Sequence, residues 1–159
     1  MLHIICAEET EAEHIKNDKA KIHVTGAGLY NVLKAPRIDI KEGDCILNIG
    51  YAGSNVFKPG EVFSVSSVER LNPSKTIKEQ KQFLYPYYFL GAECYTADDF
   101  VNMAFRELPL VDMELYYLSL IYPDIRSIKI ISDNLNYKDF KKAKLIESWE
   151  RVNKALEEL

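Results

Sequence analysis

Residues Val111–Asp133, VDMELYYLSLIYPDIRSIKIISD, constrain the fold more than any other part of this chain. Two carboxylates that bracket a methionine precede an apolar, aromatic run, LYYLSLIY, which is typical of a short buried helix. A Pro-Asp pair ends this run, and Ser127–Ile131 then predicts a short strand. A strand–helix–strand unit brings the carboxyl ends of two parallel strands to one edge of an open sheet, where ligands bind. We therefore expect Glu114 and Asp133 to face one ligand from neighbouring strand ends.

Each of the two acids also has a purely structural explanation. A glutamate at the start of a helix is favoured by the helix dipole, and an aspartate directly after a strand is a common N-cap. Glu114 and Asp133 fit these descriptions as well. Other motifs in the chain are therefore needed to separate a ligand site from two ordinary helix starts.

The V-D-M-E pattern, followed by I-S-D at the end of the next predicted strand, resembles the nucleoside phosphorylase and nucleosidase family. Within that family it is similar to the 5′-methylthioadenosine/S-adenosylhomocysteine nucleosidase branch. The resemblance implies one domain over residues 1–159, with an α/β fold in which a single mixed β-sheet is flanked by helices. It also implies hydrolysis of the N-glycosidic bond of a purine nucleoside, without a cofactor, in nucleoside catabolism such as methionine salvage.

The same resemblance assigns a role to each residue of the two motifs. Asp133 would be the general acid that protonates N7 of the departing purine, and Ser132 would orient it on the base side of the site. Glu114 would bind the ribose hydroxyls, while Met113 would pack on the sugar face. Cleavage builds positive charge on the ribose and negative charge on the purine, so groups that act on these charges accelerate the step.

The amino-terminal region continues the resemblance. The first predicted strand, Leu2–Ala7, leads directly into an acidic stretch, Glu8–Glu11, as in the family. Glu11 falls on the acid that positions or deprotonates the attacking water. A second strand, Ile22–Thr25, precedes Gly26–Asn31, which is similar to the family's G-x-G-x-x-N turn, although a lone Gly-x-Gly is weak evidence. Three acids around a neutral ligand are costly to bury unless they are protonated or hydrogen-bonded, and this cost itself suggests catalysis.

A glycine-containing segment supplies the next match. It reads as a buried strand, Cys45–Ile49, a loop with Gly50 and Gly53, a Pro-Gly turn and a hairpin strand, Glu61–Val68. The order N-I-G-Y-A-G resembles the family's N-x-G-x-A-G, so Ala52 and Gly53 are expected beside the ribose, where small residues let the backbone approach. A glycine-rich hairpin connection is the alternative, but it explains the glycines and not their order.

The segment Tyr95–Val101, YTADDFV, resembles the family's S/T-x-D-x-F-[IV] sequence. In the family the Phe stacks on the base and the backbone of the next residue reads the purine edge. Phe100 and Val101 are therefore predicted to bind the base, since an aromatic ring offers a flat apolar face. An ordinary core position for Phe100 is the alternative.

The chain also departs from the family pattern. It is a shortened version of typical members, chiefly between Glu11 and Cys45 and again around Leu71–Tyr88, where the family has segments that cover the site or build the subunit contact. Tyr51 stands where the family usually has a small or hydroxylated residue, so its ring could narrow the pocket or replace a missing wall.

A third departure bears on the choice between hydrolysis and phosphorolysis. Asn48 stands where phosphorylases carry an Arg that holds the phosphate, and an asparagine cannot replace that charge. Hydrolysis is therefore predicted. Phosphorolysis through a non-standard phosphate site, for instance Arg37 or Arg70, is one alternative. A nucleoside-binding protein that has lost turnover is the other.

The composition agrees with a soluble domain: the 159 residues are 47% apolar and 28% charged. A net charge of −4 without a basic stripe argues against nucleic acid as a partner. No segment is long enough to span a membrane, and a signal peptide is not evident. Three cysteines in apolar contexts (Cys6, Cys45 and Cys94) fit reduced thiols and predict a cytoplasmic protein. Because Cys-x-x-Cys and His-x-x-x-His spacings do not occur, no metal site is expected.

The remaining elements follow from periodicity. After the hairpin strand we expect a Tyr-rich segment, a helix and a strand before the LYYLSLIY helix. A closing helix is expected over Tyr137–Glu158, with an apolar stripe that packs on the sheet. The Tyr-rich segment Phe83–Phe89, FLYPYYF, could be an ordinary strand with one buried face. Aromatic clusters of this kind are enriched at interfaces, and we instead predict a two-fold symmetric homodimer with this segment at or near the contact.

Overall fold

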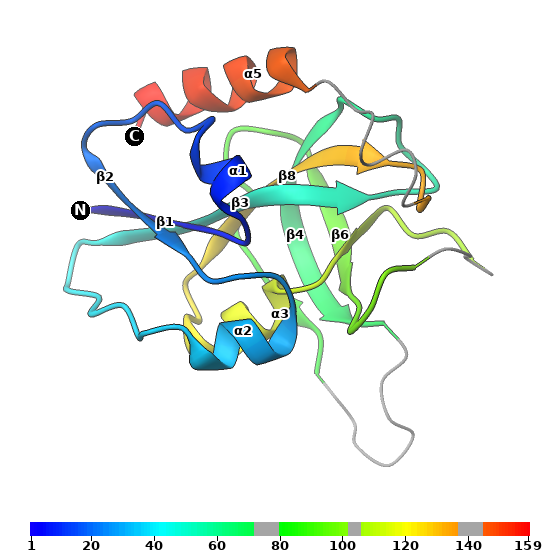
Figure 1. Ribbon diagram of the computed structural model, residues 1–159, viewed down its shortest axis with the longest axis horizontal. Coiled ribbons are helices and arrows are strands. Elements are labelled where there is room, and N and C mark those ends of the chain that lie inside the picture. Colours follow the sequence, from blue (N-terminus) through cyan, green and yellow to red (C-terminus); the bar gives the residue numbers. More distant parts are fainter. Residues whose placement is uncertain (72–79, 102–105, 137–144) are drawn as a thin grey trace.

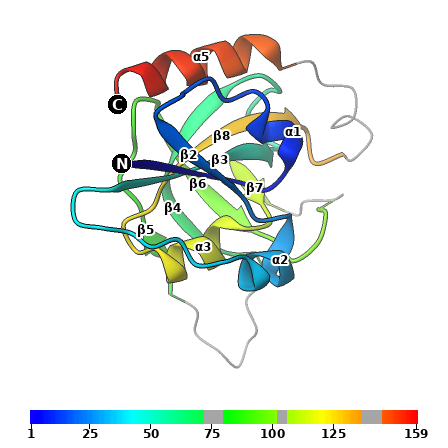
Figure 2. The same ribbon diagram turned by 60° about the vertical axis from the view of Figure 1, so that its left-hand side comes forward.

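The computed structural model describes residues 1–71, 80–101, 106–136 and 145–159. These residues form an eight-stranded sheet with helices on both faces (Figures 1 and 2). The strands are β1 (Leu2–Cys6), β2 (Ala20–Val24), β3 (Cys45–Gly53), β4 (Val62–Arg70), β5 (Gln82–Phe83), β6 (Gly91–Thr96), β7 (Leu110–Asp112) and β8 (Arg126–Asp133). The helices are α1 (Glu9–Ala12), α2 (Gly28–Lys34), α3 (Leu115–Ile121) and α5 (Ile146–Glu157).

The sheet is mixed, as predicted, and part of it closes into a barrel. Strands β2, β1, β3 and β8 run parallel to one another, whereas β4, β6 and β7 run in the opposite direction. Because β8 pairs with both β3 and β4, the path β3-β7-β6-β4-β8 returns to its start. The predicted hairpin between the third and fourth strands is wrong, since β8 lies between them.

The predicted parallel unit around α3 is also wrong. Strand β7 pairs antiparallel with β3, while β8 pairs parallel with β3, so the two strands that flank α3 run in opposite directions. Gly53 at the end of β3 is the register partner of both Val111 in β7 and Asp133 in β8. The end of β3, and not a parallel crossover, therefore brings the V-D-M-E and I-S-D motifs together.

The core has a layer on each side of the strands. Ile5 belongs to a cluster with Leu115 of α3, whereas its neighbour Ile4 belongs to a cluster with Trp149 of α5. Figure 1 shows this arrangement, with α5 along one face of the sheet and α2 and α3 at the other. Strands that are buried on both faces are apolar at successive positions, which is why β1 and β8 lack a clear polar alternation.

Several predicted boundaries change. Gly50 and Gly53 lie inside β3 and not in a loop. The described part of the closing helix begins at Ile146, while residues 137–144 of its predicted range lie outside the described residues. The described residues between the Tyr-rich segment and β7 form β6 and no helix, and residues 102–105 of that interval lie outside the described part. None of the described helices is long and apolar enough to cross a membrane.

Candidate active site

One pocket lies where α1, the ends of β3 and β8, and the segments 99–101 and 111–114 meet. All of the site residues predicted from the sequence line it: Glu11, Ala52, Gly53, Phe100, Val101, Met113, Glu114, Ser132 and Asp133. They come from separate parts of the chain, and the fold gathers them around one cavity. Their individual roles stay predictions.

Glu11 is a buried carboxylate on the first turn of α1, 4% exposed. Its Oε2 accepts hydrogen bonds from the backbone N–H groups of Ala7 (2.9 Å) and Glu8 (3.1 Å), and its Oε1 accepts one from Tyr51 N–H (2.9 Å). Burial raises the pKa of Glu11 above its ordinary value, although these N–H groups and Lys129 oppose the shift. A carboxylate offers about four acceptor positions, so one remains for a water in the pocket.

The approach of Glu11 to β3 depends on the absence of a side chain at Gly50. A Cβ on Gly50 would lie 2.8 Å from Glu11 Oε1, which is too close for the present geometry. We expect Gly50→Ala to displace Glu11 and to lower the unfolding free energy by about 1–3 kcal/mol, the range for overpacking. Thermal unfolding measures this loss. It should largely disappear in a Glu11→Ala background, and an equal loss in both backgrounds would show that Glu11 is not the group displaced.

Glu114 lies at the start of α3, yet its carboxylate is not used as a cap. It is 6% exposed, and its Oε1 accepts a hydrogen bond from the backbone N–H of Gly28 at the start of α2 (2.9 Å). Burial, followed by the charge of Asp112, raises the pKa of Glu114 to about 7, against the opposing effects of Lys129 and the Gly28 N–H. Its second oxygen is available to a ligand, so Glu114 can act as a hydrogen-bond acceptor whose charge changes near neutral pH.

Asp133 lines the pocket from the end of β8. Its Oδ2 accepts a hydrogen bond from the hydroxyl of Ser132 (2.7 Å), the contact predicted between these two residues. A Cβ on Gly53 would lie 3.0 Å from Asp133 Oδ1 and 2.6 Å from Leu135 Cδ2. A glycine at position 53 therefore lets Asp133 and Leu135 pack directly against the end of β3.

The candidate base-binding residues Phe100 and Val101 follow a bend at Asp98 and Asp99, which side-chain contacts hold in place. Phe100 is 57% exposed at the rim of the pocket, which argues against an ordinary core position. Asp98, two residues earlier, pairs with Arg70 at the end of β4 (2.6 Å) and accepts a hydrogen bond from the hydroxyl of Tyr117 in α3. These contacts fix the start of the segment to two separate elements, so its position relative to the pocket is set by the fold.

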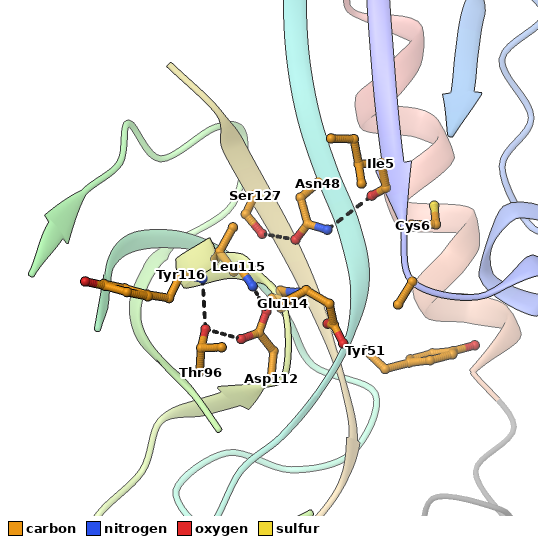
Figure 3. A network of polar contacts seen from close by, with 12 residues as sticks. Ile5, Cys6, Asn48, Tyr51, Thr96, Asp112, Glu114, Leu115, Tyr116 and Ser127 are labelled. Atoms are coloured by element: carbon orange, nitrogen blue, oxygen red, sulfur yellow. Dashed lines mark hydrogen bonds and ion pairs between the residues drawn. The ribbon is translucent and has the colours of Figure 1, made fainter. Parts of the chain in front are cut away.

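Sequence reasoning missed a buried ion pair beneath the pocket. Lys129 Nζ lies 2.7 Å from Asp112 Oδ2, with both side chains fully buried. Asp112 also accepts hydrogen bonds from the hydroxyl of Thr96 (2.6 Å) and the backbone N–H of Leu115 (3.0 Å), as Figure 3 shows. A lysine inside the apolar run of β8 was the signal that could have found this pair, because a buried ammonium requires a buried acid.

The two departures at positions 48 and 51 have distinct structural consequences. The amide of Asn48 donates to the Ile5 carbonyl (3.1 Å) and accepts from the Ser127 hydroxyl (2.9 Å), so it cross-links β1, β3 and β8 away from the pocket (Figure 3). Tyr51 does line the pocket, but its hydroxyl accepts a hydrogen bond from Trp149 of α5 (2.8 Å). The ring is thus held against α5 and forms part of the wall.

The charged side chains among the described lining residues of the pocket are all acidic. Its lining includes six carboxylates: Glu8, Glu11, Asp99, Asp112, Glu114 and Asp133. No lysine, arginine or histidine is among the lining residues that the structure describes. Arg70 is paired with Asp98, and Arg37 lines a different cavity, beside α2 and α3. Among the described residues, no group of three His, Cys, Asp or Glu side chains is arranged to hold a metal ion.

Comparison with known proteins finds similar folds among solved structures but no match in sequence. No family model matches the sequence, and no curated protein is similar to it in sequence. In structure it resembles a single-residue variant of the MTAN of Chlamydia trachomatis bound to MTA, with a TM-score of 0.76 at 20% identity over 98% of this chain and 94% of the other. The parent protein of this variant, bound to adenine, gives a TM-score of 0.75 at 20% identity over the same shares. A Helicobacter pylori MTAN variant with 5′-methylthioadenosine in its active site gives 0.75 at 12% identity, over 99% and 98%.

The likeness extends along nearly the whole of both chains in each case. The fold is therefore that of the nucleoside phosphorylase and nucleosidase class. More particularly, it is the fold of the 5′-methylthioadenosine/S-adenosylhomocysteine nucleosidases.

Proposed function

We propose that this chain hydrolyses the N-glycosidic bond of a purine nucleoside and releases the base. The observation that carries the proposal is the convergence of Glu11, Glu114 and Asp133 on one pocket, in a fold shared with nucleosidases. Each carboxylate is held differently, by three backbone N–H groups, by one N–H group and by a neighbouring hydroxyl. Different surroundings suit acids that perform different tasks in one reaction.

On the base side, Asp133 donates a proton to N7 of the purine as the bond between N9 and C1′ breaks. Ser132 holds the Asp133 carboxyl through its hydroxyl, so the acid keeps one orientation. The exposed ring of Phe100 stacks on the purine, and the backbone of Val101 reads its edge. These contacts stabilise the negative charge that develops on the leaving base, and so they lower the barrier.

On the sugar side, Glu114 accepts hydrogen bonds from the ribose hydroxyls, with Met113, Ala52 and Gly53 against the sugar. A water bound at Glu11 attacks C1′ and transfers its proton to that carboxylate. The raised pKa of Glu11, caused first by its burial, makes it a better proton acceptor than an exposed glutamate. The products are the free purine and a sugar that carries the oxygen of the water.

Hydrolysis fits the charge of the pocket better than phosphorolysis. No cationic side chain among the described lining residues would hold a phosphate dianion, and the ionised acids of the pocket would repel it. The substrate class is a 5′-substituted adenosine of the methylthioadenosine or adenosylhomocysteine type. Structures of the same fold that contain MTA or adenine support this choice.

A panel of purine nucleosides, each incubated with and without phosphate, tests the proposal through chromatography of the released base. We expect release from methylthioadenosine or a related adenosine at a rate that does not depend on phosphate. Release that requires phosphate would assign the chain to phosphorolysis. Binding without release from any nucleoside would leave a non-catalytic binding protein.

We further propose that residues 1–159 act as one catalytic domain in the cytoplasm, in nucleoside catabolism. Cys6, Cys45 and Cys94 are free thiols, and Cys6 and Cys94 are buried. Burial raises the pKa of both of these thiols above its ordinary value, which keeps them protonated and unreactive. Unoxidised cysteines of this kind support a reducing compartment.

We expect a homodimer with Phe83–Phe89 at or near its contact. Phe83 and Tyr85 are 80% and 76% exposed, although the Tyr87 hydroxyl donates to the Ala155 carbonyl in α5. Exposed aromatic rings are typical of interface cores. Light scattering at micromolar concentration should give a dimer, and Phe83→Lys combined with Tyr85→Lys should give a monomer.

The matched control for this prediction is Tyr30→Lys on α2, which is also exposed but lies away from the segment. It should leave the dimer intact. No residue of Phe83–Phe89 lines the pocket, so both substitutions lie outside the candidate site. An active wild-type preparation that is monomeric would contradict the prediction.

A further inference from the structure

The buried lysine of β8 pairs with Asp112 inside an otherwise apolar part of the sheet. Lys129 has 1% of its side chain exposed and is the largest of the fully buried side chains among the described residues. Burying a paired lysine and aspartate costs several kcal/mol of desolvation, and two apolar residues of similar size would often stabilise a core as well or better. A charged pair at this position therefore points to a role in the neighbouring site.

The position of the pair relative to the pocket indicates that role. Asp112, Met113 and Glu114 are consecutive, and Asp112 and Glu114 both line the pocket, while Lys129 lies behind them and is not part of the lining. The Asp112 carboxylate accepts hydrogen bonds from the backbone N–H of Leu115 and from the Thr96 hydroxyl. The same hydroxyl accepts a hydrogen bond from the backbone N–H of Tyr116. Lys129 thus pairs with the Asp112 carboxylate, and that carboxylate holds the turn that contains Met113 and Glu114.

Lys129 is also close to the other buried acid of the site. In the sheet it is the register partner of Gly50, the residue that Glu11 approaches at close range. The positive charge of Lys129 lowers the pKa of both Glu11 and Glu114, whose burial acts in the opposite direction. Burial opposes the charge of Lys129 itself, but Asp112 and Glu114 raise the pKa of its ammonium above the ordinary value, so it stays charged.

We propose that Lys129, acting through Asp112, is a positioning residue that fixes the 112–115 turn and favours the ionised form of Glu114. This inference rests on the proposed function for its kinetic consequences, because an ionised Glu114 is the form that accepts hydrogen bonds from ribose hydroxyls. The charged and titratable groups that act on Glu114 come from several elements. They are Asp112 (β7), Lys129 (β8), Glu11 (α1), the Gly28 N–H (α2) and the buried thiol of Cys94 (β6), with Asp133 (β8) also on the pocket lining.

Two substitutions should move the acid limb of the pH profile of kcat/KM, the range in which kcat/KM rises with pH, in opposite directions. Lys129→Met removes the cation at nearly constant length, so the limb should shift to higher pH by about one unit or more, the scale for a lost neighbouring charge. Because the pKa of Glu114 is already about 7, a shift of one unit should lower kcat/KM by at least about fivefold at pH 7, and the loss should shrink at pH 9. Asp112→Asn removes the like charge next to Glu114, so its limb should move to lower pH.

Two further variants provide rescue and a control. Lys129→Arg keeps the charge and should keep the wild-type acid limb. Lys154→Met removes an exposed lysine of α5 and should leave the profile unchanged. A loss of kcat/KM in Lys129→Met that is equal at all pH values would overturn the proposal, because a merely structural role predicts that result. Movement of the limb in the same direction for Lys129→Met and Asp112→Asn would also overturn it.

A measurement that needs no turnover separates this inference from the proposed function. Carbon-13 NMR of protein labelled at the glutamate carboxyl carbons reports the ionisation of Glu114 directly, with its signal identified by its loss in Glu114→Gln. The midpoint should rise by about one pH unit in Lys129→Met and fall in Asp112→Asn. If the wild-type protein releases no base, the proposed function fails while this titration still decides the role of Lys129. An unchanged midpoint in both variants would refute the inference.

Discussion

Asp133→Asn is expected to bind adenine as well as the wild-type protein and to lose at least about a hundredfold in turnover, the usual scale for a lost general acid. Asparagine has nearly the same shape and can still accept the hydrogen bond from the Ser132 hydroxyl, which measures 2.7 Å to Asp133. It cannot transfer a proton to N7 of the purine. Steady-state release of the base measures the loss, and calorimetric titration with adenine measures the binding.

The matched control is Asp124→Asn, an exposed aspartate in the turn before β8, which should keep wild-type turnover. Both variants should unfold at the temperature of the parent or close to it. Near wild-type turnover in Asp133→Asn would remove Asp133 from the acid role. A parallel loss of adenine binding and turnover would instead show that the substitution damages the pocket as a whole.

Glu114→Gln should separate the sugar half of the site from the base half. The amide keeps an acceptor for the Gly28 N–H but loses the charge that strengthens hydrogen bonds from ribose hydroxyls. Nucleoside affinity and turnover should therefore fall by about tenfold or more, whereas affinity for free adenine should stay nearly constant. Titration with adenine and with a slowly cleaved nucleoside analogue measures the two affinities. An equal loss for both ligands would remove Glu114 from the ribose site.

The same substitution has a consequence for stability. The pKa of Glu114 is raised to about 7 in the folded protein, first by burial, from an ordinary value of 4.5. The stability that its protonated form contributes is therefore fully present below about pH 4.5 and is lost as the pH rises through 7. Glu114→Gln has no proton to lose. It should therefore unfold at a higher temperature than the wild type at pH 8 and at a similar temperature at pH 5. The gain in unfolding free energy at pH 8 should not exceed about 3 kcal/mol. A wild type that is the more stable protein at pH 8 would contradict this.

The local pattern of the sequence was enough to predict much of the fold. Strands β1 and β8 are short apolar runs, and α3 ends at the Pro-Asp pair that follows it, so their positions depend on nearby residues alone. The direction of β7 could not be predicted in this way. A strand of three residues, Leu110–Asp112, carries no periodicity that distinguishes parallel from antiparallel pairing, and only tertiary contacts place it against β3 and β6.

In the candidate site, too, some residues can be predicted from the local sequence and others depend on tertiary contacts. Residues that match family motifs, such as Glu11, Phe100 and Asp133, were found because their neighbours in the sequence mark them. Lys129 was missed because its partner Asp112 lies 17 residues away in another strand, and the sequence does not show which side chains meet across a barrel. Buried polar pairs of this kind depend on the register of the strands, which follows from the closed sheet.

The origin of the oxygen on the product sugar tests the central claim most directly. The chain should be incubated with methylthioadenosine in water enriched in oxygen-18, in the presence of phosphate, and the sugar product analysed by mass spectrometry. Hydrolysis at this site predicts free adenine and a free sugar that carries one oxygen-18 atom from water. A sugar 1-phosphate without the label, or intact nucleoside after prolonged incubation, would contradict the account.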